Sequence, residues 1–288
     1  MPDRLITLPE TANWVAFYRA LESERPDAIF RDPFARELAG KRGEEIVDQI
    51  PRGRSYAWPM IVRTAVMDEI ILRLAPGLDV VLNLAAGLDA RPYRLALPSG
   101  LRWIDVDYPA TLEYKASILA GATPHCALER VPLDLADVPA RRALFARAGG
   151  QAREVLVITE GLVAYLSEEQ VGALADDLAA QPSFHRWTTD VASPMVLRMI
   201  SRVWGKHMDA GSATFRFGPE DAAAFYAAHG WRLAEYHAAI INAQRLGREF
   251  PFAWLFRMLR PSMWRAEKGR TTGPMSGVLL LENAKTAV

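Results

Sequence analysis

The pattern of apolar and polar positions changes abruptly within VVLNLAAGLDARPYRL, from Val80 to Leu95. Its first five residues, Val80 to Leu84, are aliphatic apart from one asparagine and do not alternate with polar residues. This pattern is typical of a strand in a parallel sheet that helices cover on both faces. The run ends at Ala85-Ala86-Gly87, where the glycine permits a tight turn and the close approach of a ligand.

Further apolar runs of strand length follow, separated by segments with helical periodicity. Strands alternating with helices of this length favour a doubly wound parallel sheet. The last two strands, connected by helix and loop alone, suit an antiparallel edge. The predicted strands are Val80 to Leu84, Arg102 to Val106, Leu128 to Leu133, Glu154 to Thr159, Phe184 to Val191, Trp231 to Ala238 and Ser276 to Glu282.

The part of the chain before the first strand shows helical periodicity. One helix begins near Thr11, and Asp32-Pro33 supplies the N-cap and first-turn proline of a second helix, which Gly40 would end. A third helix, Trp58 to Leu74, carries Arg63 among aliphatic neighbours. An arginine in that setting usually extends to the surface, but its guanidinium can instead turn towards a carboxylate in a cleft.

Four successive strand ends carry residues that are suited to ligand binding: Gly87, Asp107, Asp134 and Glu160. In open α/β sheets, ligands bind in the crevice at the carboxyl ends of the strands. Asp107 follows Gly87 by 20 residues (107 − 87), the usual separation between the glycine turn and the ribose-binding acid of nucleotide-binding folds. One acid at a strand end is usually a helix cap, but this succession indicates a nucleotide-type site.

Composition narrows the class of protein. The 34 basic and 34 acidic residues balance, so no overall field favours nucleic acid or an anionic membrane. The single cysteine, Cys126, excludes an intramolecular disulfide and a multi-cysteine metal site, and we expect no bound metal. No apolar run reaches the ~18 residues of a membrane span and the N-terminus lacks a signal-peptide core, so we expect a cytoplasmic protein. The basic stretch Arg245 to Arg270 suits a solvated helical face or a dimer surface better than RNA binding.

Several of these segments together resemble a known family. The most specific are GLDARPYR and ITEGLVAYL, and around them RPDAIFRDPFARELAG, IVRTAVMDEIIL, WIDVDYPATLEYKASIL and VPLDLAD occur in family order. From about Arg25 to Val171, the chain resembles the leucine carboxyl methyltransferase superfamily of S-adenosylmethionine-dependent class I methyltransferases, which includes bacterial polyketide-type O-methyltransferases. The resemblance implies a Rossmann-like α/β fold with a seven-stranded, mostly parallel sheet, helices on both faces, an N-terminal helical cover and a helical lid insertion after the fifth strand.

The resemblance also implies a division of the chain and a cofactor. A single methyltransferase domain would consist of a helical cover (1–76), a cofactor-binding core (77–192), a lid insertion (193–218) and the C-terminal part of the sheet (219–288). The cofactor would be S-adenosylmethionine, which leaves as S-adenosylhomocysteine.

The same resemblance assigns cofactor-binding roles to individual residues. Two acceptor oxygens suit Asp107 to the two ribose hydroxyls, and a planar guanidinium suits Arg63 to the cofactor carboxylate. The other assignments are the backbone of Ala85 to Gly87 for the methionyl part, Asp134 and the Leu135 backbone for the adenine amino group, and Glu160 for the cationic amino group. Ala85 stands where many relatives carry glycine, so we expect a wider turn or a slightly displaced cofactor.

The catalytic residues are less constrained by the sequence. Methyl transfer from a sulfonium is an in-line displacement that needs alignment and exclusion of water, and no catalytic triad. A carboxylate acceptor needs no base, whereas a hydroxyl would benefit from one. We name His207 on the lid insertion as the candidate base, ahead of His185 and His237, and Tyr165 as a residue of the acceptor pocket.

Aromatic residues outside the nucleotide-binding core either roof an apolar acceptor pocket or pack the helical cover onto the sheet. We expect that some of Trp14, Tyr18 and Trp204 shape the acceptor site. The full set is Trp14, Phe17, Tyr18, Trp204, Phe250, Phe252, Trp254 and Phe256.

These observations predict an O-methyltransferase of secondary metabolism that acts, as a monomer or homodimer, on a carboxylate or hydroxyl of a small aromatic or polyketide-like metabolite. Two alternatives stay open: a carboxyl methyltransferase of a protein C-terminus, and a non-catalytic scaffold that binds S-adenosylmethionine. Intact Arg63, Asp107 and Glu160 argue against a decayed site. An NAD-dependent oxidoreductase is disfavoured because no G-x-G-x-x-G follows the first strand.

Overall fold

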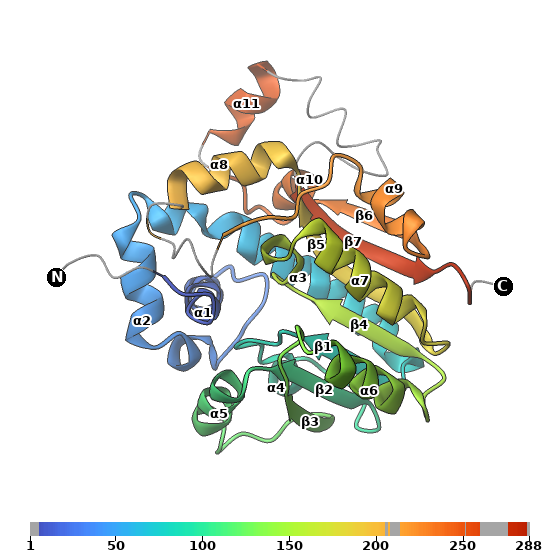
Figure 1. Ribbon diagram of the computed structural model, residues 1–288. Helices are drawn as coiled ribbons and strands as arrows, with labels where there is room; N and C mark the ends of the chain where they lie inside the picture. The colour runs from blue at the N-terminus through green and yellow to red at the C-terminus, as the bar shows by residue number, and fades with distance from the viewer. Residues whose placement is uncertain (1–5, 205–206, 208–213, 251, 260–275, 287–288) are drawn as a thin grey trace.

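The computed structural model describes residues 6–204, 207, 214–250, 252–259 and 276–286, without the side chains of residues 203–204 and 256–257. Seven strands form one sheet in the order β3-β2-β1-β4-β5-β7-β6 (Figure 1). Strands β1 to β5 are parallel, and β7 is antiparallel to both β5 and β6, which confirms the predicted fold. The strands are β1 Val80–Leu84, β2 Arg102–Asp107, β3 Ala127–Pro132, β4 Val155–Thr159, β5 Phe184–Ala192, β6 Trp231–Ala238 and β7 Ser276–Asn283.

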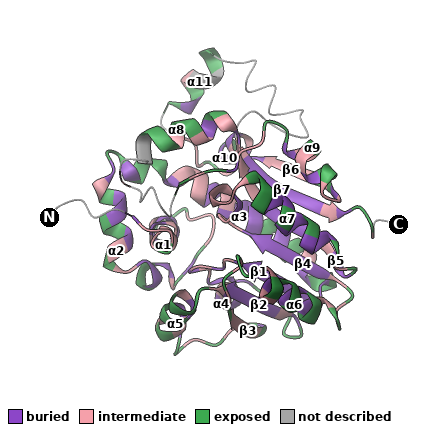
Figure 2. Ribbon diagram, in the orientation of Figure 1, coloured by how far each residue is buried: buried purple, intermediate pink, exposed green. Residues whose placement is uncertain are grey.

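Helices cover both faces of the sheet, which explains why β1 is apolar without alternation. Val80, Leu82 and Leu84 pack with α6, α7 and α9 on one face, while Val81 packs with α3 and α10 on the other. Figure 2 shows the strands as a mainly buried layer between these helices. The helices that make up the two layers are α3 Ala57–Leu74, α6 Val138–Gly149, α7 Glu168–Ala179, α9 Ala222–Ala228 and α10 Ala239–Arg245.

The N-terminal cover consists of α1 (Thr11–Ser23) and α2 (Ala35–Gln49), which pack together and over the loop after β1 through a buried cluster that includes Leu88. Gly40 breaks the helical conformation with a φ of 57°, but a second helical piece continues beyond it. The first helical piece therefore ends at Gly40, as predicted, and a second piece that we did not predict follows it.

The predicted helical insertion after the fifth strand is present as α8 (Pro194–Trp204), which contributes Ile200 to the same cluster. The remaining helices are short: α4 Arg91–Arg94, α5 Pro109–Ile118 and α11 Ala253–Leu259. In the described ranges, none of the helices combines the length and apolarity that a membrane crossing requires.

The order of the strands creates a crevice between β1 and β4. After β1 the chain builds β2 and β3 on one side, and then returns to place β4 on the other side of β1. At such a switch point, the loops that leave the carboxyl ends of the two strands diverge and open a ligand-binding crevice. Gly87 follows β1 and Glu160 follows β4, so two predicted site residues flank this crevice.

Candidate functional site

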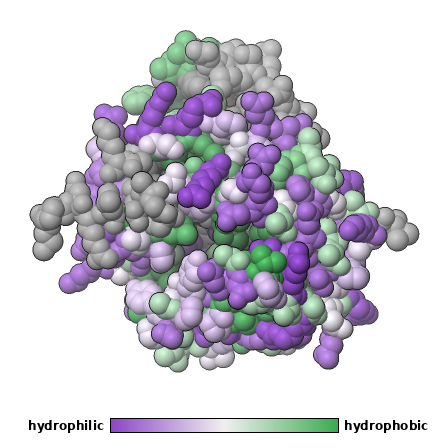
Figure 3. Space-filling model, in the orientation of Figure 1, coloured by the Kyte–Doolittle hydropathy of each residue, from purple (hydrophilic) through white to green (hydrophobic). Residues whose placement is uncertain are grey.

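A cavity of about 1110 Å³ lies at the carboxyl ends of the strands. Its walls come from the loops that follow β1 to β5 and from α1, α3, α8 and α10. Hydrophobic side chains lie in the hollowed middle of the face drawn in Figure 3. Pockets for one small ligand usually measure about 300–1,000 Å³, so this cavity is large enough for two molecules in contact.

The turn after β1 is built from left-handed backbone conformations. Ala85 has a φ of 53° and Gly87 a φ of 47°. Ala85 therefore adopts a conformation that glycine favours. In an alanine this conformation costs about 1 kcal/mol or more in backbone strain. At Gly87 a Cβ atom would lie 3.3 Å from the Cβ of Ala12, so the glycine lets α1 close over the turn.

Asp107, at the end of β2, is fixed against this turn. One carboxylate oxygen accepts a hydrogen bond from the Gly87 N–H at 2.7 Å, and the other accepts one from the Tyr108 N–H at 2.7 Å. Burial raises the pKa of the carboxyl group and outweighs the opposite effect of these two donors. The predicted ribose-binding acid therefore lies on the cavity wall beside the glycine turn.

Asp134 and Leu135 line the cavity after β3. Asp134 accepts a hydrogen bond from the Ala136 N–H at 2.9 Å, and the Leu135 carbonyl accepts one from Arg141 at 2.9 Å. The hydroxyl of Tyr108 lies 3.5 Å from Asp134, so the ends of β2 and β3 meet at this wall.

Arg63 points from α3 to the ends of β4 and β5. Its Nε lies 3.0 Å from a carboxylate oxygen of Glu160, and its Nη1 lies 3.0 Å from one of Asp190. Burial opposes the positive charge, but Asp190 and Glu160 outweigh it and raise the pKa of Arg63. Gly161 has a φ of 70°, and a Cβ there would lie 3.3 Å from the guanidinium, so only glycine leaves room for Arg63. Asp190 in turn accepts a hydrogen bond from the Gly161 N–H at 2.6 Å.

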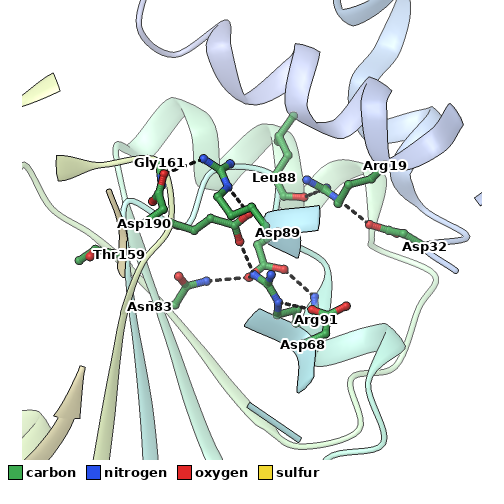
Figure 4. A network of polar contacts seen from close by, with 12 residues as sticks. Arg19, Asp32, Asp68, Asn83, Leu88, Asp89, Arg91, Thr159, Gly161 and Asp190 are labelled. Atoms are coloured by element: carbon green, nitrogen blue, oxygen red, sulfur yellow. Dashed lines mark hydrogen bonds and ion pairs between the residues drawn. The ribbon is translucent and has the colours of Figure 1, made fainter. Parts of the chain in front are cut away.

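A second arginine, Arg91 on α4, holds the other oxygen of Glu160 at 2.6 Å. Arg91 also pairs with Asp89 at 2.9 Å and with Asp68 at 2.7 Å (Figure 4), and only 2% of its side chain is exposed. Burial alone would raise the pKa of Glu160, but Arg91 and Arg63 hold it at about 2. Glu160 therefore stays ionised at any ordinary pH.

These contacts belong to a network with an excess of negative charge. Arg94 continues it to Asp68, and Arg19 pairs with Asp32 at 2.8 Å. Within it, four arginines face five carboxylates, so the buried charged end of the cavity suits a ligand with net positive charge. The members are Arg19, Arg63, Arg91, Arg94, Asp32, Asp68, Asp89, Glu160 and Asp190.

Another part of the cavity wall is aromatic. Tyr165 lines it and stacks on Phe215, with ring centroids 5.0 Å apart. Burial raises the pKa of Tyr165 to about 12, so at neutral pH its hydroxyl donates hydrogen bonds and does not act as a base. The other aromatic side chains that line the cavity are Trp14, Tyr18, Tyr56, Trp58, Tyr108, Phe250 and Phe252.

Not all of the aromatic residues singled out from the sequence lie there. Phe17 is buried below the guanidinium groups of Arg36 and Arg54, outside the cavity lining. Trp254 is 59% exposed and also lies outside the lining. The side chains of Trp204 and Phe256 lie outside the described residues.

The three histidines named from the sequence lie in different parts of the structure. The carbonyl of His207 accepts a hydrogen bond from the Ile6 N–H at 2.8 Å, and His207 is absent from the cavity lining within the described part of the chain. His185 pairs with Glu154 at 2.9 Å at the amino end of β5, away from the cavity. His237, near the carboxyl end of β6, lines the cavity.

The structure also bears on a metal site and on the basic stretch from Arg245 to Arg270. Among the residues that the structure describes, no cluster of three histidine, cysteine or acidic side chains could hold a metal ion. In the basic stretch, Arg245 pairs with Glu69 at 2.7 Å and Arg248 pairs with Glu22 at 2.8 Å. The other five basic side chains between Arg245 and Arg270 lie outside the described ones, so the prediction of a helical face or dimer surface stays a prediction.

A family model confirms the resemblance. The model of the leucine carboxyl methyltransferase family matches residues 12–179, more than half of the chain. The chain belongs to the leucine carboxyl methyltransferase family. The matched region contains Arg63, the turn after β1 and the ends of β2, β3 and β4, whereas Asp190 and His237 lie beyond it.

Similarity to other proteins covers most of the chain, beyond the region that the family model matches. A Streptomyces coelicolor protein, provisionally named an S-adenosyl-L-methionine-dependent methyltransferase, is 35% identical over 83% of this chain and 87% of its own length. A Mycobacterium avium protein of the same provisional name is 32% identical over 91% of each chain. A DUF574-family protein from Streptomyces avermitilis, 16% identical, has the same fold, with a TM-score of 0.56 over 95% of this chain and 97% of its own.

Several residues of the site were not predicted from the sequence. Asp190 ends a predicted strand, and the rule that selected Glu160 would have found it. Asp89 and Arg91 lie within GLDARPYR, but the pattern alone gives them no role because their partners come from α3 and β4. Asp68 carried no signal, since an acid on a helix is usually solvated.

Proposed function

We propose that this protein transfers a methyl group from S-adenosylmethionine to an oxygen atom of a small apolar molecule, of aromatic or polyketide-like character. The observation that carries the proposal is one cavity with a charged end and an aromatic end. The charged end suits the cofactor, and the aromatic end suits a flat acceptor.

The residues of the charged end fit S-adenosylmethionine, whose sulfonium and amino groups outweigh its single carboxylate in charge. Asp107 holds the ribose hydroxyls, and Asp134 with the Leu135 backbone holds the adenine. Arg63 binds the carboxylate in exchange for part of its pairing with Asp190, while Glu160 and Asp190 attract the cationic groups. The network is rigid because every guanidinium has carboxylate partners before the cofactor binds.

The cofactor supplies a methyl group on sulfur, which leaves as a neutral thioether. What remains for the chain is to align the acceptor oxygen behind this methyl group and to exclude water. The aromatic side chains contributed by α1 and α3 provide a flat, apolar wall for both tasks. We infer a small-molecule acceptor because this wall lies inside the cavity.

Calorimetric titration with S-adenosylmethionine, S-adenosylhomocysteine and NAD tests the cofactor assignment. We expect micromolar binding of the two adenosyl ligands, weakened about 10- to 100-fold in Asp107→Asn, because hydrogen bonds to a charged group contribute about 1.5–3 kcal/mol. Glu113→Gln, an exposed carboxylate on α5 outside the cavity lining, is the matched control and should bind normally. Binding of NAD alone would overturn the assignment.

Transfer of a labelled methyl group separates the proposed acceptor from the two alternatives. We expect label on flat aromatic phenols or acids and none on peptides with free C-termini. Preferential labelling of the peptides would identify a protein carboxyl methyltransferase. Tight cofactor binding with no transfer to either panel would favour a regulatory scaffold.

A further inference from the structure

His237 and Glu235 form a pair on the cavity side of β6. They are two residues apart in a strand, so their side chains lie on the same face of the sheet. The His237 Nε2 atom lies 2.8 Å from Oε2 of Glu235. His237 lines the cavity, and 27% of its side chain is exposed.

Glu235 is itself held by an arginine from α3. Arg73 lies 2.7 Å from one oxygen of Glu235 and 2.8 Å from the other. Burial alone would raise the pKa of Glu235, but Arg73 and His237 outweigh it and keep the pKa below its usual value. Because Glu235 stays ionised and is held in place by Arg73, it can orient the imidazole of His237.

The strand register places His237 level with the charged end of the cavity. His237 pairs with Val278 of β7, and Val278 pairs with Asp190 of β5. Directly opposed residues point to the same face, and neighbouring strands lie about 4.8 Å apart. The Cα atoms of His237 and Asp190 are therefore about 10 Å apart on one face, with a single strand between them. Since Asp190 holds Arg63, the imidazole lies one strand beyond the residues that anchor the cofactor.

The pair with Glu235 also sets the orientation of the ring. An ionised carboxylate only accepts hydrogen bonds, so Nε2 is the donor to Glu235, and in the neutral form of the ring the lone pair lies on Nδ1. Within the described part of the chain, Nδ1 has no hydrogen-bond partner. His237 thus presents Nδ1, and not Nε2, as the nitrogen that is available to a ligand at this wall of the cavity.

Three other titratable groups of the cavity are less suited to remove a proton. Glu160 and Asp190 are paired with arginines, and Tyr165 is protonated at neutral pH. Among the described residues that line the cavity, His237 is the one histidine.

We propose that His237 is the general base of the transfer, positioned by Glu235 and Arg73, and that the acceptor group is accordingly a phenol or another hydroxyl, not a carboxylate. This rests on the proposed function. The acceptor O–H proton passes to Nδ1 while the oxygen forms a bond to the methyl carbon. The carbon–sulfur bond breaks and its electron pair returns to sulfur. The imidazolium then releases the proton to water.

The charged neighbours determine how the rate depends on pH. Those on the elements packed around His237 are Glu235 on its own strand, Asp190 on β5, Arg73 and Glu69 on α3, and Arg245 on α10, which pairs with Glu69. A carboxylate beside an imidazole favours its charged form, so removal of Glu235 should move the acidic limb of the rate profile to lower pH.

The test uses the full chain, S-adenosylmethionine with a labelled methyl group, and matched probes: naphthols and hydroxyanthraquinones against the corresponding carboxylic acids. We expect His237→Gln to lower kcat on the phenols about 100-fold or more, with little change in KM or in cofactor affinity. Glu235→Gln should lower kcat less and move the acidic limb to lower pH. His185→Gln is the control, because it breaks a similar histidine–glutamate pair away from the cavity.

Several outcomes would overturn the proposal. One is turnover of phenols by His237→Gln at the wild-type rate, and another is methylation of the acids alone. If no probe is turned over, NMR of the ring nitrogens of His237 in the S-adenosylhomocysteine complex tests the proposal instead. We expect addition of a naphthol to shift these signals in the wild type, and the absence of a shift would refute the proposal. If neither adenosyl ligand binds, the proposed function fails first, so the two failures are distinguishable. Unchanged thermal melting of both variants excludes a folding defect.

Discussion

The two ends of the cavity are built in different ways. The charged end comes from strand ends and the helices next to them, and its side chains are fixed by ion pairs of 2.6–3.0 Å. The aromatic end comes from the N-terminal helices and from the segments after β4 and α8, and its rings are held by packing, such as Tyr165 on Phe215. A ligand shared by a whole family can be bound by directional contacts on a rigid sheet. An acceptor that varies among relatives is more easily accommodated by shape, on elements that can change without disturbing the sheet.

Among these substitutions, removal of Arg63 should have the largest effect on stability and on cofactor binding. Arg63→Ala leaves Glu160 and Asp190 buried without their shared partner, which typically costs about 3–5 kcal/mol. We expect a fall in melting temperature and loss of cofactor binding in calorimetry. Arg63→Lys keeps the charge without the planar fork and should be affected less. Normal cofactor binding by Arg63→Ala would show that this end of the cavity is not the cofactor site.

Acid should weaken the charged end selectively. The pKa of Glu160 in the folded protein, about 2, lies below its ordinary value of 4.5, so its pairing is fully stabilising above about pH 4.5 and is lost as the pH falls towards 2. We expect the difference in free energy of unfolding between the wild type and Glu160→Gln, measured in urea, to be constant from pH 7 to 5 and to shrink below pH 4.5. A difference that grows with acidification would contradict the role given to the two arginines.

A substitution at the aromatic end should separate acceptor binding from cofactor binding. Trp58 lines the cavity and contacts Phe250, with ring centroids 5.7 Å apart. We expect Trp58→Ala to raise the KM of a phenol substrate about 10-fold through lost apolar contact while the cofactor affinity stays unchanged. Trp254→Ala is the control, since this exposed tryptophan lies outside the lining and its removal should change neither value.

The smallest effect is expected at the turn after β1. Ala85→Gly removes the cost of a left-handed alanine but gives the unfolded chain more freedom, so we expect a net gain of about 0.5–1 kcal/mol, or roughly 2 °C in melting temperature. Differential scanning calorimetry would detect it. A lower melting temperature would mean that the turn depends on the methyl group of Ala85.

The same contrast explains what could be predicted from the sequence. Strands buried on both faces have an unmistakable composition, so the sheet and the position of β1 followed directly. Gly87, Asp107, Asp134 and Glu160 followed as well, because strand ends meet at one edge whatever the details of packing. Arg63 needed the family resemblance, since its helical neighbours are consistent with a surface role.

The aromatic end could be predicted only in part, because it depends on how separate helices pack: Trp14, Tyr18 and Tyr165 line the cavity as expected, but Phe17 does not. Nothing in the local sequence distinguishes Phe17, which is buried in the cover, from Trp14 and Tyr18 in the same helix, which reach the cavity. The same limit applies to His237, which lies on the cavity wall although the local sequence offered no reason to rank it above His207. Its position depends on the pairing of β6 with β7, which is a long-range property of the sheet.

The position of β7 also affects the order of folding. It is the last of the seven strands to be synthesised, yet it lies between β5 and β6 and pairs with both. Until β7 has been synthesised, β5 lacks a partner on one edge and β6 lacks the strand with which it pairs. The sheet is therefore completed by insertion of a strand and not by addition at an edge. Such late, non-local pairing slows folding and prolongs the exposure of unpaired strand edges.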